Sequence, residues 1–183
     1  MRASALLAAL TLGAAPLAAQ RSSVLPIELG VDAGISRDDR TDVTTLLVPV
    51  SRLRVGFFIS PTLSLEPTLF GFRSSSDGGS NSQVSAGLGL LAHIGGVPVG
   101  RARTTSLFVR PFAGFSRSGF NPDNGPSRSS TQANFGAGLG VKLPVADRLA
   151  WRLEGVYTRF AASDDFSGRN SYGLNLGLSF HTR

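Results

Sequence analysis

Apolar and polar residues alternate along this chain with a period of two, most regularly near its C-terminal end. In residues 170–180 one face holds Tyr172, Leu174, Leu176, Leu178 and Phe180, and the other holds Ser171, Gly173, Asn175, Gly177 and Ser179. A period of two is typical of a β-strand, because successive side chains of a strand point to opposite faces. The segment is uncharged and 11 residues long, as expected of a tilted strand that crosses a bilayer with roughly 9–11 residues.

Seven earlier segments repeat this alternation, and each has one apolar face. In chain order these faces consist of Ile27, Leu29, Val31, Ala33 and Ile35; Leu53, Val55, Phe57 and Ile59; Leu63, Leu65 and Leu69; Val84, Ala86, Leu88, Leu90, Ala92 and Ile94; Leu107, Val109, Ala113 and Phe115; Phe135, Ala137, Leu139, Val141 and Leu143; and Leu149, Trp151, Leu153 and Tyr157. An even number of strands lets an antiparallel barrel close with both termini at one end. The pattern therefore predicts an all-β fold, an eight-stranded antiparallel transmembrane β-barrel within residues 20–183.

The links between these segments differ in length in a regular way. Those that follow the odd-numbered segments are long and polar, at about residues 37–44, 74–82, 118–130 and 161–169. The links at 60–61 and 144–148 are short, as periplasmic turns are in outer-membrane barrels. The link at 95–104 is long, so either this turn is extended or its flanking strands run further.

Three positions disturb the strand pattern. Pro67 and Pro111 lie inside predicted strands although proline has no N–H to give to a ladder, so we expect bulges or local breaks there. Residues 46–50 are out of phase with the segment that begins at Leu53, which predicts a bulge near Ser51 and Arg52 or a separate extended segment.

Residues 1–19 have a basic start, a short apolar core and a small-residue end, so they are predicted to be a secretory signal peptide cleaved near Ala19 or Gln20. An N-terminal core helix is the alternative. No apolar run reaches the roughly 18 residues of a transmembrane helix, so a membrane crossing has to be made by strands.

Composition narrows the function further. The formal charge is +6, but the basic residues are scattered singly and form no nucleic-acid footprint. Cysteine is absent, which excludes disulfides and thiolate metal sites.

The closing segment resembles the last strand of small outer-membrane β-barrels of the OmpA/OmpX type, which ends in an aromatic residue and is read by the barrel-assembly machinery. The residues that carry the resemblance are Tyr172, Gly173, Leu176, Leu178 and Phe180. Here the chain continues through His181, Thr182 and Arg183, which departs from the family pattern. The resemblance implies an outer-membrane location in a Gram-negative envelope and a role in envelope integrity, adhesion or surface protection. It also implies outer-membrane lipid and lipopolysaccharide as neighbours, and surface loops whose partner the sequence does not identify.

Alternation alone does not say which face is inside, because a soluble lipocalin-like barrel has its apolar face inward. Glycine favours the membrane barrel. The polar face carries Gly30, Gly34, Gly56, Gly87, Gly89, Gly114, Gly136, Gly138, Gly140, Gly173 and Gly177. Inside a narrow barrel, glycines make room for large side chains, whereas on a solvent-exposed face they only weaken the strands. We therefore predict a lumen filled by side chains and no general porin activity.

With the polar face inside the barrel and the apolar face toward lipid, roles can be predicted for two sets of residues. The predicted interior charge network consists of Glu28, Asp32, Glu66 and Glu154 with Arg54, Arg110, Lys142 and Arg152, and Arg52 is a fifth inward base. The predicted aromatic girdles consist of Phe57, Trp151 and Phe180 at one rim and Phe115, Phe135, Tyr157 and Tyr172 at the other. Buried charges need partners, and bilayer interfaces favour aromatic rings.

Catalytic, cofactor and metal sites are not predicted. Some small outer-membrane barrels are enzymes that modify lipid A with a His/Ser pair. Here Ser85 lies on the same strand and face as His93, but eight residues of strand separate them by roughly 26 Å. The glycines of residues 136–140 lack the spacing of a phosphate-binding loop. Aspartates at 38–42 and 164–165 suit Ca²⁺ or bridging cations, although solvated loop carboxylates explain them as well.

Overall fold

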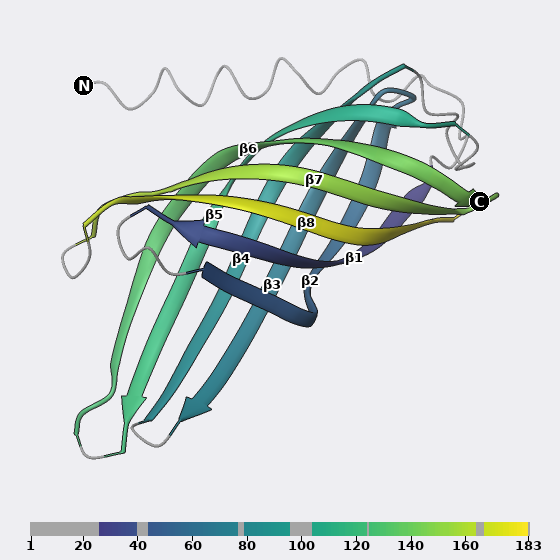
Figure 1. Ribbon diagram of the computed structural model, residues 1–183. Helices are drawn as coiled ribbons and strands as arrows, with labels where there is room; N and C mark the ends of the chain where they lie inside the picture. Colours follow the sequence, from purple (N-terminus) through teal and green to yellow (C-terminus); the bar gives the residue numbers. More distant parts are fainter. Residues whose placement is uncertain are drawn as a thin grey trace, which may run out of the picture.

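The computed structural model describes residues 26–39, 44–76, 79–95, 104–123, 125–163 and 167–182, with backbone alone for 45–51 and 76. The predicted signal peptide lies outside this range. Eight strands follow one another in order: β1 (Ile27–Asp38), β2 (Thr44–Ser60), β3 (Leu63–Ser76), β4 (Gly79–Ile94), β5 (Ser106–Pro122), β6 (Arg128–Ala146), β7 (Leu149–Phe160) and β8 (Arg169–His181). Each pairs antiparallel with the next, and β1 pairs with β8, so the sheet closes into the predicted barrel (Figure 1). The described residues include no helix long and apolar enough to cross a membrane.

The two ends of the barrel are built differently. At one end, here called the turn end, β2 and β3 are joined by residues 61–62 and β6 and β7 by 147–148. The other end, here called the hairpin end, carries the links that follow β1, β3, β5 and β7. Between β4 and β5 the strands stop at Ile94 and start again at Ser106, so they run no further than predicted, and most of this link lies outside the described residues.

The barrel closes through the last residues of the chain. β1 and β8 keep a continuous register from Glu28 opposite His181 to Asp38 opposite Ser171. Beyond Phe180, the Thr182 N–H donates to the Ile27 carbonyl at 2.8 Å, and the Ile27 N–H donates to the Thr182 hydroxyl at 2.9 Å. The tail that departs from the family pattern therefore extends the closing strand.

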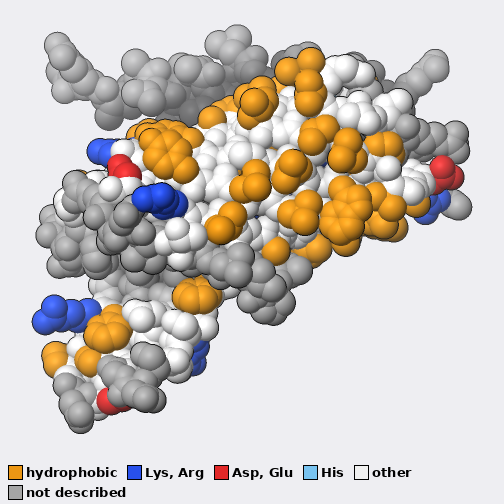
Figure 2. Space-filling model, in the orientation of Figure 1, with side chains coloured by type: hydrophobic (Ala, Val, Ile, Leu, Met, Phe, Trp, Pro, Cys, Tyr) orange, Lys and Arg blue, Asp and Glu red, His pale blue; other side chains and the backbone are white. Residues whose placement is uncertain are grey.

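Large apolar side chains cover the outside of the barrel. Those of Leu29, Leu53, Leu139 and Leu176 are 47%, 53%, 64% and 51% exposed, whereas their neighbours along the same strands point inward. In Figure 2 hydrophobic side chains spread over the barrel wall, and charged side chains gather at its two ends. A soluble ligand-binding barrel has the opposite arrangement, so the structure rules out the lipocalin-like alternative.

The disturbed positions are resolved by local changes in pairing. Asp32 pairs with Arg52, but Gly34 pairs with Leu47, so β2 has three more residues than β1 over this stretch. The predicted irregularity is confirmed as a bulge within one continuous strand.

The prolines break the ladder without a bulge. The strand register is the same on both sides of Pro67 and on both sides of Pro111. The pairs at Pro67 are missing from the ladder between β3 and β2, and the pairs at Pro111 are missing from the ladder between β5 and β4. Each proline keeps its pairing with the opposite neighbour, Leu88 or Ala137. The missing N–H is therefore tolerated because each ladder is interrupted on one side only.

Two of the predicted long links are mostly strand, which corrects the sequence prediction. β3 and β4 pair as far as Ser76 and Gly79, and β5 and β6 pair as far as Phe120 and Arg128. Figure 1 shows these hairpins running together to the lower left. Hydrophobic periodicity does not reveal such segments, because outside the apolar band neither strand face has to be apolar.

Candidate functional site

The lumen holds a continuous set of ion pairs, here called the charge network. Arg54 lies in the half of the charge network that is nearer the turn end. It donates from Nη1 to Glu28 at 2.8 Å and from Nε to both oxygens of Asp32 at 3.0 Å. Its Nη2 donates to the Ser179 hydroxyl at 2.8 Å and the Leu178 carbonyl at 3.1 Å, and the Lys142 ammonium donates to the second oxygen of Glu28. All guanidinium nitrogens of Arg54 therefore have partners.

The other half of the charge network is built around two glutamates. Arg152 donates to Glu66 at 2.6 and 3.2 Å and to Glu154 at 3.1 Å. Arg110 donates from Nε to Glu154 at 2.7 Å and lies 3.6 Å from Glu66. A 3.7 Å approach between Arg54 and Glu66 joins the two halves. The charge network thus combines four carboxylates with four bases, so the buried charge is balanced.

The structure places all eight network residues predicted from sequence in the lumen. Each is at most 3% exposed. Arg52 also lines the lumen, but none of the ion pairs between described residues includes it. The sequence supplied the inward parity of these residues, whereas the pairing partners depend on barrel closure and were not predictable.

Glycine provides the space that the charge network needs. A Cβ at Gly30 would overlap the Arg54 guanidinium, and one at Gly138 would overlap the Glu154 carboxylate. A Cβ at Gly177 would likewise overlap the Asp32 carboxylate. Each of these charged side chains therefore lies across the bare backbone of a neighbouring strand, which gives the glycine-rich polar face its physical reason.

Aromatic rings close the lumen at the turn end. The His93 ring stacks on Phe58 with centroids 5.5 Å apart and lies 6.5 Å from Phe108, and His181 lies 6.2 Å from Phe58. Phe58 and Phe108 are 3% and 0% exposed. This cluster was not predicted from the sequence, although Phe58, His93 and Phe108 all have inward parity.

The lipid-A enzyme alternative required Ser85 and His93 to come together. The Ser85 hydroxyl instead shares a 2.6 Å hydrogen bond with Ser116, and His93 packs in the aromatic cluster at the turn end. The register places them eight strand residues apart, opposite Phe70 and Phe108 respectively. They do not form a nucleophile–base pair.

The predicted girdle residues all point outward. Phe57, Trp151 and Phe180 are exposed near the turn end, and Phe115, Phe135, Tyr157 and Tyr172 are exposed toward the hairpin end. Tyr157 and Tyr172 face each other across β7 and β8 with ring centroids 5.4 Å apart. The Tyr157 hydroxyl donates to Asn170 at 2.9 Å, so its polar edge faces the polar rim.

The residues of the proposed assembly signal lie on β8. Tyr172, Leu176 and Phe180 are exposed, Leu178 is half-buried on the same outward face, and Gly173 faces the lumen. These residues belong to the strand that closes the barrel against β1.

Acidic residues at the hairpin end form no metal cluster within the described ranges. Asp38 pairs with Arg169 at 3.1 Å, and Asp39 accepts hydrogen bonds from the Asn170 backbone and side-chain amides at 2.9 and 2.6 Å. Asp42, Asp164 and Asp165 lie outside the described residues. Asp38 and Asp39 therefore tie β1 to β8.

Comparison with known proteins agrees with this architecture. Neisserial surface protein A superimposes with a TM-score of 0.61 at 12% identity, covering 88% of this chain and 99% of that chain. Ail, the attachment invasion locus protein of Yersinia pestis, superimposes with a TM-score of 0.51 at 15% identity, covering 86% of this chain and 97% of that chain. A major outer membrane protein from Thermus thermophilus gives 0.50 at 13% identity, covering 85% and 99%. The search of curated protein sequences gave no match.

At these identities the solved structures establish the barrel fold alone, but the sequence itself matches a family. Residues 4–180 match the outer membrane protein beta-barrel domain. The exposed apolar wall, the aromatic rims and the filled lumen are the features that such a domain needs in a bilayer. The chain therefore belongs to the outer membrane protein beta-barrel domain family and is a protein of the outer membrane.

Proposed function

We propose that this protein is a surface-contact protein, in which the barrel is a sealed anchor and the β3–β4 and β5–β6 hairpins carry the contacts. The observation behind the proposal is the asymmetry of the two ends. β5 and β6 contain 17 and 19 residues, whereas a bilayer crossing needs roughly 9–11. β3 and β4 contain 14 and 16 residues, so both hairpins extend beyond the lipid, while the β2–β3 and β6–β7 links at the turn end are two-residue turns. An enzymatic activity is not part of the proposal.

The chemistry of the hairpins favours an anionic partner. Arg73, Arg117 and Arg128 are exposed there, and Arg117 and Arg128 line one hollow of about 400 Å³. Asp123 is the acidic residue described between β5 and β6. Figure 2 shows basic side chains on the hairpin part of the molecule. Two guanidinium groups that share a hollow suit sulfate or phosphate groups of a glycan, because arginine binds such groups bidentately.

One structural neighbour supports this choice of chemistry. Ail was solved in complex with the heparin analogue sucrose octasulfate. That ligand belongs to Ail, and the two proteins share 14% identity. The proposal for this chain rests on its own arginines and uses a sulfated glycan as the probe.

The experiment measures binding of lipid vesicles that contain the refolded protein to a heparin-coated surface. Arg117→Gln with Arg128→Gln should abolish most of the binding, and added salt should weaken it in the wild type, since exposed charges are screened within about 8 Å at physiological ionic strength. Arg148→Gln, at the turn end, is the control for loss of one positive charge. Binding that persists in the double variant would overturn the role of the hairpins.

A sealed barrel is the second part of the proposal. The charge network and the aromatic cluster fill the turn-end half of the lumen, and an eight-stranded barrel has room for little besides side chains. Planar bilayers with the refolded protein should show no steady channels that pass sugars. Channels of that size would contradict the anchor interpretation.

Assembly is expected to depend on β8. We propose that the assembly machinery reads the outward residues Tyr172, Leu176, Leu178 and Phe180 together with Gly173, and that lipid and lipopolysaccharide contact the finished wall. Removal of residues 181–183 should then leave recognition intact but reduce stability, because the two Thr182 hydrogen bonds to Ile27 are lost. Outer-membrane fractionation and thermal unfolding of the truncated protein test the two effects separately.

A further inference from the structure

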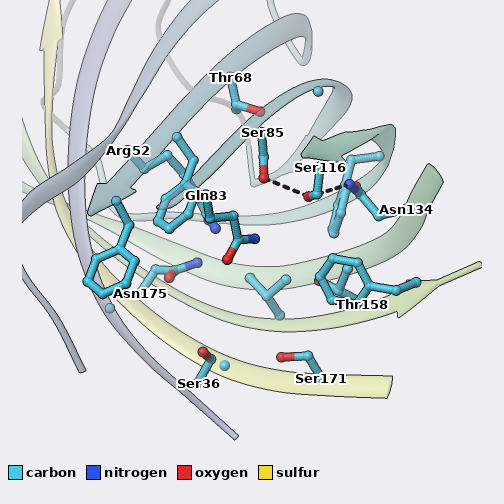
Figure 3. A pocket seen from close by; sticks show the side chains of 18 of the residues that line it. Ser36, Arg52, Thr68, Gln83, Ser85, Ser116, Asn134, Thr158, Ser171 and Asn175 are labelled. Carbon is cyan, nitrogen blue, oxygen red and sulfur yellow. Dashed lines mark hydrogen bonds between the residues drawn. The ribbon is translucent and has the colours of Figure 1, made fainter. Parts of the chain in front are cut away.

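Above the charge network, toward the hairpin end, the lumen contains a chamber of about 380 Å³, here called the outer chamber. Polar side chains from every strand line it, as Figure 3 shows: Ser36, Arg52, Thr68, Gln83, Ser85, Ser116, Asn134, Thr158, Ser171 and Asn175. Several of these side chains remain partly exposed, so solvent reaches the chamber. Its volume lies at the small end of the roughly 300–1,000 Å³ of ligand pockets, which suits one compact molecule.

Part of the lining is held in place by hydrogen bonds. The Ser116 hydroxyl joins Ser85 at 2.6 Å and accepts from the Asn134 amide at 3.0 Å, which links β4, β5 and β6 (Figure 3). Phe70 and Phe112 add apolar ring surface among these polar groups, and the Arg110 guanidinium lies 4.7 Å from the centre of the Phe112 ring. Fixed polar groups beside aromatic rings are the usual composition of a small-molecule site.

Four charged residues line the chamber, namely Asp38, Arg52, Arg110 and Arg169. Asp38 pairs with Arg169 at 3.1 Å and Arg110 pairs with Glu154 at 2.7 Å, so among the described residues Arg52 is the charge of the lining that has no ion pair. The four carboxylates of the charge network are already matched by four bases, and Arg52 is one base more. Asp32 lies opposite Arg52 in the register of β1 and β2, but Asp32 accepts from Arg54, and Glu154 accepts from Arg110 and Arg152. Within the described residues Arg52 has no ion pair of its own. A partly buried cation without a carboxylate partner favours an anion from outside the chain.

A second group in the chamber also has no partner. The Asn175 side chain is 9% exposed and lines the chamber, and its Nδ2 donates no hydrogen bond within the described residues. Buried donors are normally satisfied, and leaving one unpaired costs roughly 1–3 kcal/mol. Arg52 and Asn175 therefore present two unused donor groups to the same space.

We propose that the outer chamber binds a small hydroxylated anion, namely the acid form of a monosaccharide. The carboxylate accepts from the Arg52 guanidinium, whose fork matches a carboxylate bidentately. The ring hydroxyls exchange hydrogen bonds with the serine, threonine and amide groups of the wall, and the ring lies against phenylalanine. Because the charge network closes the lumen below, the ligand enters and leaves by the hairpin end.

The test uses two matched probes, methyl β-D-glucuronide and methyl β-D-glucoside, which differ only in carboxylate against hydroxymethyl. Binding to the refolded protein in lipid nanodiscs is measured by calorimetry. The glucuronide should bind saturably and at least tenfold more tightly than the glucoside. Arg52→Gln should remove this preference, so that the two sugars bind alike. This variant breaks no ion pair and is expected to fold, which circular dichroism checks.

Two further variants decide where the sugar binds. Thr158→Phe, which fills the chamber, should weaken the binding of both sugars. Arg148→Gln, at the turn end, should leave the binding of both sugars unchanged. A retained preference for the glucuronide in Arg52→Gln would overturn the proposal. So would the absence of saturable binding by wild type up to about 10 mM, a range in which weak ligands are still detected.

Discussion

Glu154 and Arg110 are the most informative pair in the charge network. Their side chains are 1% and 4% exposed, and the Nε–Oε1 distance is 2.7 Å. Glu154→Gln leaves Arg110 with Glu66 at 3.6 Å as its nearest carboxylate. Removing one member of a buried ion pair usually costs about 3–5 kcal/mol, because the remaining charge stays buried without compensation. We expect Glu154→Gln to reach this range.

Arg110→Gln should cost less, about 3 kcal/mol, because Glu154 keeps its hydrogen bond from Arg152 at 3.1 Å. The double variant restores charge balance in the lumen. Its cost should therefore be smaller than the sum of the single costs by about 2–3 kcal/mol. The sign of this coupling is the essential result, since it measures the penalty of an unmatched charge.

The assay is reversible urea unfolding of the refolded protein in lipid vesicles. Trp151 is the single tryptophan of the chain and is 43% exposed on the lipid face, so its fluorescence reports on loss of the membrane-embedded wall. The control cycle uses Asp38→Asn and Arg169→Gln at the hairpin end, where the side chains are 15% and 32% exposed. Such a pair should couple by less than about 1 kcal/mol. A lumen coupling no larger than that of the control would refute the compensated network.

The remaining predictions concern depth and space. Leu176→Arg should cost roughly 2–4 kcal/mol and Tyr172→Arg about 0–1, because the cost of a charge falls from the bilayer midplane to the interface; equal costs in vesicle unfolding would show that this face is not in lipid. Gly138→Ala should destabilise by about 1–3 kcal/mol, since its Cβ would overlap the Glu154 carboxylate. Gly155→Ala, where the nearest atom is 3.8 Å away, should stay within about 0.5 kcal/mol in the same unfolding assay.

The sequence alone determined the strand content and the direction of the side chains. Period-two alternation is a local property, so the outward position of Leu176 and the inward position of Arg110 followed directly from parity. Glycine on the polar face indicated which side is the lumen, because only a crowded interior needs bare backbone. The even number of segments then predicted closure with both termini together.

Strand ends were less predictable. Residues 118–130 look like a polar loop, yet most of them belong to β5 and β6, because backbone pairing continues where lipid no longer selects apolar side chains. The bulge between Leu47 and Arg52 was indicated by a phase change, but its size depends on the register with β1. Hydrophobic patterns in the sequence indicate which side of a strand is apolar, but they do not indicate which strand segments pair outside the membrane.

Only the tertiary structure decided which lumen residues meet. Arg54 reaches Glu28 and Asp32 on one strand and Ser179 on another, a meeting that requires the closure of β1 against β8. The same closure gathers Arg52 and Asn175 in the outer chamber and stacks His93 on Phe58 at the opposite end. The parity of a residue along its strand predicts that its side chain points inward. The height of that side chain along the barrel axis depends on the stagger between strands, which no single segment encodes.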